Sequence, residues 1–160
     1  MKIRLIFSLA AALAQTACAE SSVWDQPTAD LGKPVAMTVY RSPSCGCCGK
    51  WIAHMKKQGF LVKDLPTEDM DAVKRRLGVP QALQSCHTAV VDGHTVEGHV
   101  PAGDVKKLLQ SKTTIAGGLA APGMPAGSPG MEMGGAKANF SVILFDQSGK
   151  TDTFNTYSNH

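Results

Sequence analysis

Residues 35–66 read VAMTVYRSPSCGCCGKWIAHMKKQGFLVKDLP and predict a strand, a cysteine loop, a helix and a second strand. The β-rich run 35–42 ends at Pro43, and apolar side chains at helical spacing follow the cysteines up to Gly59. Two strands joined by one helix form a parallel pair with a right-handed crossover. The cysteine loop is therefore expected at the N-terminus of a helix, where the helix dipole lowers the pKa of thiols.

The next segments continue this alternation of helices and strands. Thr67 is the predicted N-cap of a helical pattern that closes at Gly78. Within 86–100, two β-rich runs flank an Asp-Gly turn at 92–93, which is typical of a hairpin, and Pro101 opens a last amphipathic helix. This order predicts an α/β, thioredoxin-like fold with a β-α-β-α-β-β-α core, a Met/Gly/Pro-rich C-terminal extension and a terminal hairpin.

The first twenty residues, MKIRLIFSLAAALAQTACAE, have the pattern of a secretory signal peptide. Ala17 and Ala19 form an A-x-A cleavage pattern before Glu20, and the apolar run is shorter than the ~20 residues of a membrane-spanning helix. Cys18 would suit a lipoprotein, but Gln15 stands where a lipobox prefers an aliphatic residue. We therefore expect export to the periplasm and no stable membrane insertion once the signal is removed.

The 160-residue chain carries a formal net charge of +3. Removal of the signal peptide takes away Lys2 and Arg4 and leaves about +1, so the charge does not favour a nucleic-acid partner. The basic run 74–76 lies in a helical pattern and is interpreted as a solvated face. We expect five segments: a signal peptide at 1–19, a flexible leader at 20–34, a thioredoxin-like metal-binding domain at 35–111, a Gly/Pro/Met-rich segment at 112–139 and a C-terminal hairpin extension at 140–160.

Four cysteines remain after export: Cys45, Cys47, Cys48 and Cys86. An even number in an oxidising compartment usually indicates structural disulfides, but vicinal cysteines bridge only with strain and one loop holds three of the four. Cys45 and Cys48 also form a C-x-x-C, which is a redox signature beside a βαβ pattern. His87 stands where thioredoxins carry a proline that faces the C-x-x-C, so Cys86 is expected to point at the cysteine loop.

Converging thiols and an imidazole are soft ligands, which select Cu(I), zinc or iron-sulfur clusters. The adjacent side chains of Cys47 and Cys48 diverge and do not easily hold one tetrahedral ion together with Cys45, whereas Cu(I) accepts two or three bridging sulfurs. We therefore favour a multi-copper cluster. A thiol-disulfide or Cu(I)/Cu(II) oxidoreductase that uses the CGCC loop is the alternative, although no conventional enzyme is expected. A structural zinc module is least favoured.

Two histidines are candidate ligands. His87 follows directly on a cysteine, and His99 lies where thioredoxins bring a loop back toward the active site. His54 is expected at the surface, and Trp51 is expected either as a core anchor or as a lid over the cysteine loop.

Three methionines are also candidate copper ligands. Met124, Met131 and Met133 stand within a Gly/Pro-rich run that is either a mobile tail or an extended wrap. Their spacing does not fit a core, and a thioether binds Cu(I) without having to lose a proton. A linker that happens to contain methionine is the simpler alternative.

Three stretches carry a resemblance to a known family: SPSCGCCGKW, RLGVPQALQSCHTAVVDGHTVEGHVPAGDVKKLL and PGMPAGSPGME. From about Val35 to Met133, the chain resembles the CopG-type periplasmic copper-resistance proteins, a family once catalogued only as a domain of unknown function. The resemblance implies a thioredoxin-like domain that binds copper at the start of its first helix. It also implies contact with other periplasmic copper-handling proteins. The implied copper ligands are Cys45, Cys47, Cys48 and Cys86.

Overall fold

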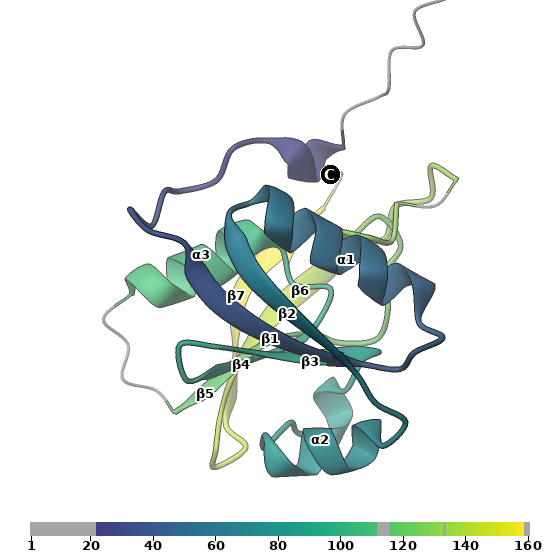
Figure 1. The fold of residues 1–160 in the computed structure, drawn as a ribbon, viewed down its shortest axis with the longest axis vertical. Helices are drawn as coiled ribbons and strands as arrows, with labels where there is room; N and C mark the ends of the chain where they lie inside the picture. The colour runs from purple at the N-terminus through teal and green to yellow at the C-terminus, as the bar shows by residue number, and fades with distance from the viewer. Residues whose placement is uncertain (1–21, 112–115, 133, 159–160) are drawn as a thin grey trace, which may run out of the picture.

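The computed structural model describes residues 22–111, 116–132 and 134–158. These residues form a mixed α/β structure with a seven-stranded sheet and three α-helices. Helices α1 and α3 cover one face of the sheet, and the shorter α2 lies on the other face (Figure 1). The predicted signal peptide and Met133 lie outside the described residues. Within the described ranges, no helix has the length and apolar character needed to cross a membrane.

The strand order across the sheet is β2-β1-β3-β4-β5-β6-β7. The β1–β2 and β4–β5 pairs are parallel, and the other neighbours are antiparallel. Up to α3, the elements follow the order that the sequence predicts. The strands are β1 (Val35–Arg41), β2 (Phe60–Pro66), β3 (His87–Val91), β4 (His94–Gly98), β5 (Gly117–Ala121), β6 (Phe140–Asp146) and β7 (Thr151–Tyr157). The helices are α1 (Gly46–Lys57), α2 (Met70–Arg76) and α3 (Ala102–Gln110), with short 3₁₀ helices at Val23–Asp25 and Gln81–Leu83.

Helix α1 begins inside the cysteine loop because Cys45 is its N-cap. The Cys45 sulfur accepts a hydrogen bond from the Cys48 amide at 3.3 Å. Trp51 and Met55 follow at helical spacing and are fully buried in the core. Each fully buried side chain of this kind contributes roughly 1.5–3 kcal/mol through the hydrophobic effect. The apolar face of α1 therefore fixes the position of the cysteine loop.

Helix α2 starts later than the sequence indicates. Asp69, and not Thr67, is its N-cap, and the Asp69 carboxylate accepts a hydrogen bond from the Ala72 amide at 2.9 Å. The Thr67 hydroxyl instead accepts one from the Asp69 amide at 3.3 Å. The prediction of Thr67 was wrong because aspartate is an equally good N-cap and the threonine forms a local turn just before it.

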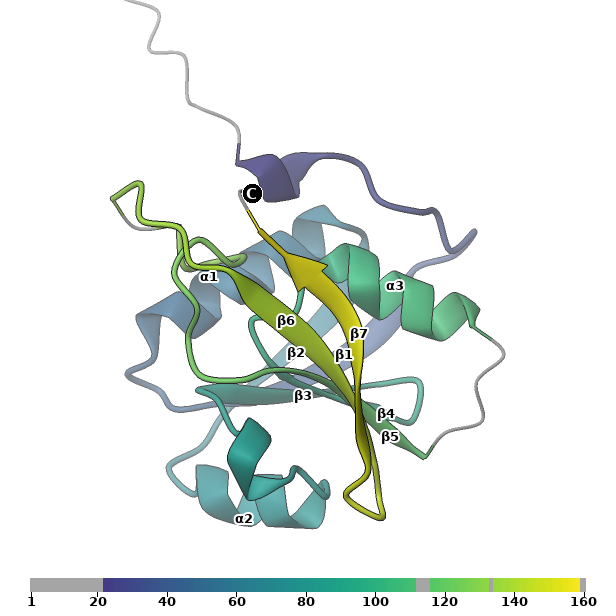
Figure 2. The same cartoon turned by 180° about the vertical axis from the view of Figure 1, so that it is seen from behind.

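The sequence does not predict β5, which lies inside the Gly/Pro/Met-rich segment. It pairs with β4 on one side and β6 on the other, so it is an interior strand (Figure 2). A Cβ atom at Gly117 would lie 2.0 Å from the Phe145 carbonyl oxygen, and one at Gly118 would lie 1.7 Å from that of Thr95. The close backbone neighbours therefore require glycine at these two positions. Because glycine is not typical of strands, the sequence pattern does not predict a strand here.

The C-terminal strands β6 and β7 form an antiparallel hairpin at the edge of the sheet (Figure 2). Trp24 packs against this hairpin, with its ring centroid 5.1 Å from that of Tyr157 and 6.4 Å from that of Phe140. The Trp24 indole N–H also donates a hydrogen bond to the Gly127 carbonyl at 2.7 Å. The described part of the leader is thus packed on the domain.

Candidate metal centre

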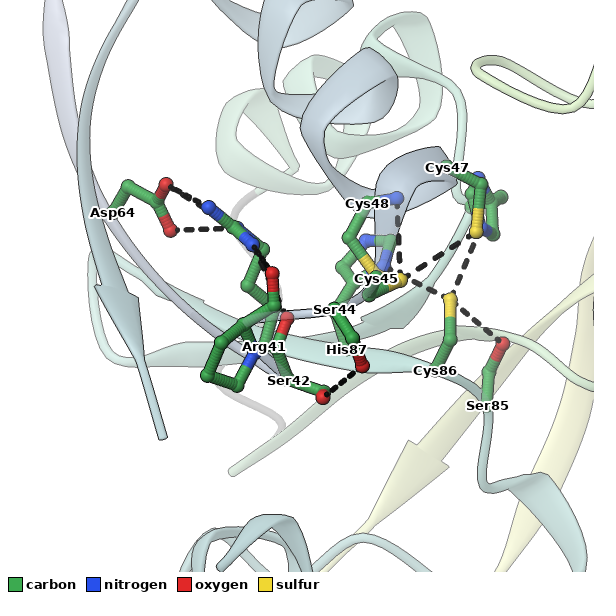
Figure 3. The surroundings of a disulfide bond; sticks show 12 residues. Arg41, Ser42, Ser44, Cys45, Cys47, Cys48, Asp64, Ser85, Cys86 and His87 are labelled. Carbon is green, nitrogen blue, oxygen red and sulfur yellow. Dashed lines mark hydrogen bonds and ion pairs between the residues drawn. A yellow bond between two sulfur atoms is a disulfide. The ribbon is translucent and has the colours of Figure 1, made fainter. Parts of the chain in front are cut away.

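Four sulfur atoms converge where α1 and β3 begin (Figure 3). The sulfurs of Cys45, Cys47, Cys48 and Cys86 all lie within 4.8 Å of one another. Cys45 and Cys48 form a disulfide bond, while Cys47 and Cys86 are free thiols. The Cys47 sulfur lies 3.5 Å from that of Cys45. The fold therefore gathers thiols from two separate segments of the sequence into one group.

Arg41, the last residue of β1, holds the entry to the cysteine loop. Its guanidinium donates hydrogen bonds to the carbonyls of Ser42 and Pro43 at 3.1 and 3.4 Å. The same group pairs with the Asp64 carboxylate of β2 at 2.8 Å (Figure 3). Because the ion pair fixes the guanidinium, the two carbonyls and the loop that follows them are held in one geometry.

Cys86 is also the centre of a thiol–imidazole group. Its sulfur lies 3.2 Å from Nδ1 of His87 and 3.1 Å from Nε2 of His99. Both histidines are fully buried, and their ring centroids are 5.0 Å apart. The ligand atoms of these three residues lie within 4.8 Å of one another. Cys86 thus belongs to both the thiol group and this one.

The hydrogen bonds of His99 define which of its nitrogens carries the proton. Its Nδ1 lies 2.8 Å from the Pro129 carbonyl oxygen, which can only accept a hydrogen bond. Burial lowers the pKa of His99, so the ring is neutral at neutral pH. Nδ1 therefore holds the single proton, and Nε2 presents a lone pair to the sulfur of Cys86.

Cys86 is held in its protonated form. Burial, followed by the nearby Cys47 sulfur, raises the pKa of the Cys86 thiol to about 12. At neutral pH its S–H can donate to the bare Nε2 of His99. A soft metal ion that binds here must displace that proton, as metal ions do at cysteine sites generally.

His87 contains a buried polar atom without a partner. Its Nε2 makes no hydrogen bond to any of the described residues, and the side chain is fully buried. The ring lies against the Trp51 indole, with centroids 4.4 Å apart. Burial, together with the charges of His99 and Lys74, lowers the pKa of His87 well below its usual value. An unpaired buried nitrogen costs about 1–3 kcal/mol, while Nδ1 is the ring nitrogen that faces the Cys86 sulfur.

The comparisons with known proteins agree with this geometry. A family model described as "Protein of unknown function, DUF411" matches residues 83–131. The solved structure "Copper resistance protein copG- Form 2" is 47% identical and has a TM-score of 0.75, over 79% of this chain and 100% of that one. The chain belongs to the CopG family. "Copper resistance protein copG- Form 1" is 48% identical with a TM-score of 0.73, over 78% of this chain and 98% of that CopG chain. We found no match among proteins with curated descriptions.

In this CopG-family chain, a second polar cluster lies on the other face of β3 and β4. The buried Glu97 carboxylate pairs with the buried Lys74 ammonium of α2. The Thr88 hydroxyl and the Ser85 amide each donate to Glu97 at 2.6 Å. The interpretation of Lys74 as part of a solvated face was wrong, because Lys74 is buried. Lys74 can be buried because it pairs with Glu97. Glu97 belongs to β4, so the sequence pattern of α2 alone does not predict this pair.

His54 is not the surface residue that the sequence suggests. It is half-buried, and its Nε2 accepts a hydrogen bond from the Ala102 amide at 3.2 Å, which caps the start of α3. Burial lowers the pKa of His54 to about 4. Trp51 is a core anchor: it is fully buried, and its indole N–H donates to the Val100 carbonyl at 2.9 Å.

The methionine segment is anchored and wraps the site. Gly123 forms a bridge to Ser85, whose hydroxyl donates to the Gly123 carbonyl. The next residue, Met124, is 56% exposed, whereas Met131 is half-buried and its carbonyl accepts from the Gly127 amide at 2.9 Å. Met124 therefore stands exposed beside the segment that carries Cys86. A metal-binding role for these methionines remains a prediction.

Proposed function

We propose that the chain is a periplasmic protein that binds Cu(I) as a thiolate-bridged cluster of several ions, in copper resistance and homeostasis. The observation that carries the proposal is the group of four cysteine sulfurs within 4.8 Å of one another. Membership of the CopG family supports copper as the ion, because the similar structures are named copper resistance proteins. The A-x-A pattern near residue 19 supports export to the periplasm.

The ligand set favours a cluster over one zinc ion. Cys86 belongs both to the four-cysteine group and to the group with His87 and His99, which supports a bridging role for its sulfur. Thiolate and neutral imidazole are soft or borderline ligands that suit Cu(I), which accepts low coordination numbers. A structural zinc site would instead use a closed tetrahedral set of four ligands.

The Cys45–Cys48 disulfide must open before all four cysteines bind metal. An external dithiol can supply the two electrons and two protons that convert this disulfide into two thiols, and it becomes a disulfide itself. Each thiol then releases its proton when it binds Cu(I). We therefore expect only the reduced chain to take up a full load of copper.

Three further parts belong to the same proposal. The thioredoxin-like assignment is supported by the β2-β1-β3-β4 order and by the cysteine loop at the start of α1. Capture of Cu(I) by Met124, Met131 and Met133 is supported by the exposure of Met124 beside Ser85 and Cys86. Delivery of copper to or from other periplasmic copper-handling proteins is the third part.

A second candidate function is that of an oxidoreductase. The observation in its favour is the Cys45–Cys48 disulfide beside the free thiol of Cys47. Opening the disulfide takes two electrons, which either a dithiol substrate or the oxidation of two Cu(I) to two Cu(II) can supply. The same chemistry in reverse would reduce Cu(II) as the disulfide forms.

The first experiment measures metal in the exported full-length protein, reduced and handled without oxygen. We expect more than one copper per chain in the wild type, and loss of most of it in Cys86→Ser with a similar free energy of unfolding. One zinc per chain would contradict the copper proposal. Unchanged copper in Cys86→Ser would contradict a site built from both segments.

The second experiment separates binding from thiol catalysis. Insulin-type disulfide reduction is measured for the metal-free and the copper-loaded protein under the same conditions. We expect weak reductase activity without metal and almost none with copper, because bound thiolates are masked as nucleophiles. Strong activity in the loaded protein would favour the oxidoreductase.

A further inference from the structure

Residues 127–132, here called the strap, cross the site between Met124 and β6. Four of them, Gly127, Ser128, Pro129 and Gly130, are buried. At one end of the strap, the Gly127 carbonyl accepts the Trp24 indole N–H at 2.7 Å. Within the strap, the Glu132 carboxylate accepts the Gly130 amide at 2.7 Å. Glu132 also accepts the Ser22 hydroxyl at 2.9 Å. The strap is thus an ordered part of the domain.

Gly130 is the point where the strap contacts α1. A Cβ atom at Gly130 would lie 2.7 Å from the Trp51 amide nitrogen and 3.0 Å from the Cys47 carbonyl oxygen. These neighbours are backbone atoms of a helix and cannot move aside easily. The φ angle of Gly130 is +83°, which also favours glycine. Only glycine therefore lets the strap lie directly on the first turn of α1, which carries the cysteines.

The residue before this contact, Pro129, is the one that binds His99. Its carbonyl oxygen accepts the Nδ1–H of His99 at 2.8 Å, and the opposite nitrogen, Nε2, lies 3.1 Å from the Cys86 sulfur. A series of contacts thus connects α1 with Cys86, through Gly130, Pro129 and His99. Each link in the series is a hydrogen bond or a backbone contact described above.

We propose that the strap selects the tautomer of His99, so that Nε2 offers a lone pair to Cys86 and to any Cu(I) bound there. Pro129 is the positioning residue in this scheme, and Gly130 lets it reach His99. The second half of the proposal, the effect on Cu(I), rests on the proposed function. The first half concerns the metal-free chain alone.

The physical reason lies in the two ring nitrogens. In a neutral imidazole, the nitrogen that carries the proton is set by the hydrogen bonds around the ring. Without the Pro129 carbonyl, the proton can move to Nε2, where it would point at the Cys86 sulfur and occupy the lone pair that a metal needs. Partners that orient a ligating histidine typically change metal affinity by about 10–100-fold when they are removed.

The test compares Gly130→Ala with Gly135→Ala in the reduced full chain. Gly135 also has a positive φ, of +75°, but a Cβ atom there would meet nothing within 4 Å, so it controls for backbone strain alone. Nitrogen-15 NMR of the metal-free proteins reads the tautomer of His99, whose signal is assigned with a His99→Gln variant. Competition with a Cu(I) chelator then gives the affinity.

We expect the Nδ1–H tautomer in the wild type and in Gly135→Ala, and a mixture of tautomers in Gly130→Ala. Cu(I) affinity should fall about tenfold or more in Gly130→Ala only. An unchanged tautomer in Gly130→Ala would overturn the inference, whatever its affinity. If Gly130→Ala does not fold, Glu132→Ala loosens the strap without adding a Cβ clash, and it should shift the tautomer in the same direction.

The two proposals fail in different ways. If no variant, including the wild type, binds Cu(I), the proposed function fails and the tautomer comparison still decides the role of the strap. If the tautomer shifts but Cu(I) affinity does not, the strap orients His99 and the link to copper is wrong.

Discussion

The two faces of the β3–β4 hairpin each bury a polar cluster, and they differ in how fully their polar atoms are paired. Under α2, the carboxylate of Glu97 receives hydrogen bonds from Lys74, Thr88 and Ser85. Under α1, His87 keeps a ring nitrogen without a partner among the described residues, and Cys86 keeps a free thiol. The clusters are only one residue apart in the sequence, since His87 and Thr88 are neighbours.

This difference indicates what each cluster is for. A buried charge pair with every hydrogen bond made needs nothing from outside, and its removal leaves an unpaired charge. A buried thiol–imidazole group contains no charge pair of its own, and the fold gains stability when a ligand binds there. The first cluster is a structural support, and the second is suited to binding.

The largest effect should come from breaking the paired cluster. Lys74→Met leaves the Glu97 carboxylate buried and unpaired, so the free energy of unfolding should fall by about 3–5 kcal/mol. Denaturation by urea measures it. The double variant Lys74→Met/Glu97→Leu should recover most of the loss, because no charge is then left buried. A double variant as unstable as the single one would mean that the pair itself stabilises the fold.

His54 is a half-buried imidazole that has its partner in the protein, and its titration should be the next largest effect. The unfolded chain takes up a proton at His54 near pH 6.5, but the folded chain does so only at about pH 4. The free energy of unfolding should therefore fall by about 3 kcal/mol as the pH drops through this window. Burial sets this shift, while four charges modify it: Glu132, Asp25, Lys57 and Lys106.

Urea denaturation of wild type and His54→Gln across this pH range isolates the effect. Glutamine keeps an acceptor for the Ala102 amide but does not titrate, so the difference between the two proteins reports His54 alone. Parallel curves for the two proteins would contradict the assignment.

A smaller change in the free energy of unfolding is expected when His87 of the thiol–imidazole group is replaced. His87→Phe removes the orphaned Nε2 and keeps a flat ring against Trp51, so the free energy of unfolding should change by less than about 1 kcal/mol. Cu(I) affinity in the same variant should fall about tenfold. A large loss of stability would show that His87 is a structural residue, comparable to Lys74.

The smallest effect should come from replacing the exposed Met124, which should change only the rate of Cu(I) loading. Met124→Leu keeps the apolar volume but removes the soft sulfur, so the rate of Cu(I) loading from a dilute source should fall a few-fold at unchanged final content. Stopped-flow loading measures it. Met131→Leu is the matched control, because Met131 is half-buried and should matter less. Equal rates in all three proteins would make the segment a simple linker.

Local patterns in the sequence were enough to predict the core order and the position of the cysteine loop. The turn signal at 92–93 also predicted the β3–β4 hairpin, whereas the position of Cys86 opposite the cysteine loop was expected from the comparison with thioredoxins. These features depend on neighbours in the chain, such as the turn dipeptide and the helical spacing after Pro43.

Features set by distant neighbours could not be predicted in this way. Strand β5 needs glycine because β4 and β6 leave no room for a Cβ at 117 and 118, and single-segment patterns read such glycines as a loop. The burial of Lys74 depends on Glu97 from another element, and the hydrogen bond from the Ala102 amide to His54 depends on the start of α3. Such pairings become visible only when the fold is known.

The Trp51 ring lies tilted against the His87 ring, so its fluorescence should report on this site. The chain has two tryptophans, and only Trp51 touches the thiol–imidazole site, with its ring 4.4 Å from that of His87. Trp24 packs instead on Tyr157 and Phe140, so it provides an internal reference signal. A ligand that binds at His87 should quench the fluorescence of Trp51 and leave that of Trp24 unchanged. Loading can then be followed in real time by the fluorescence of the unlabelled chain.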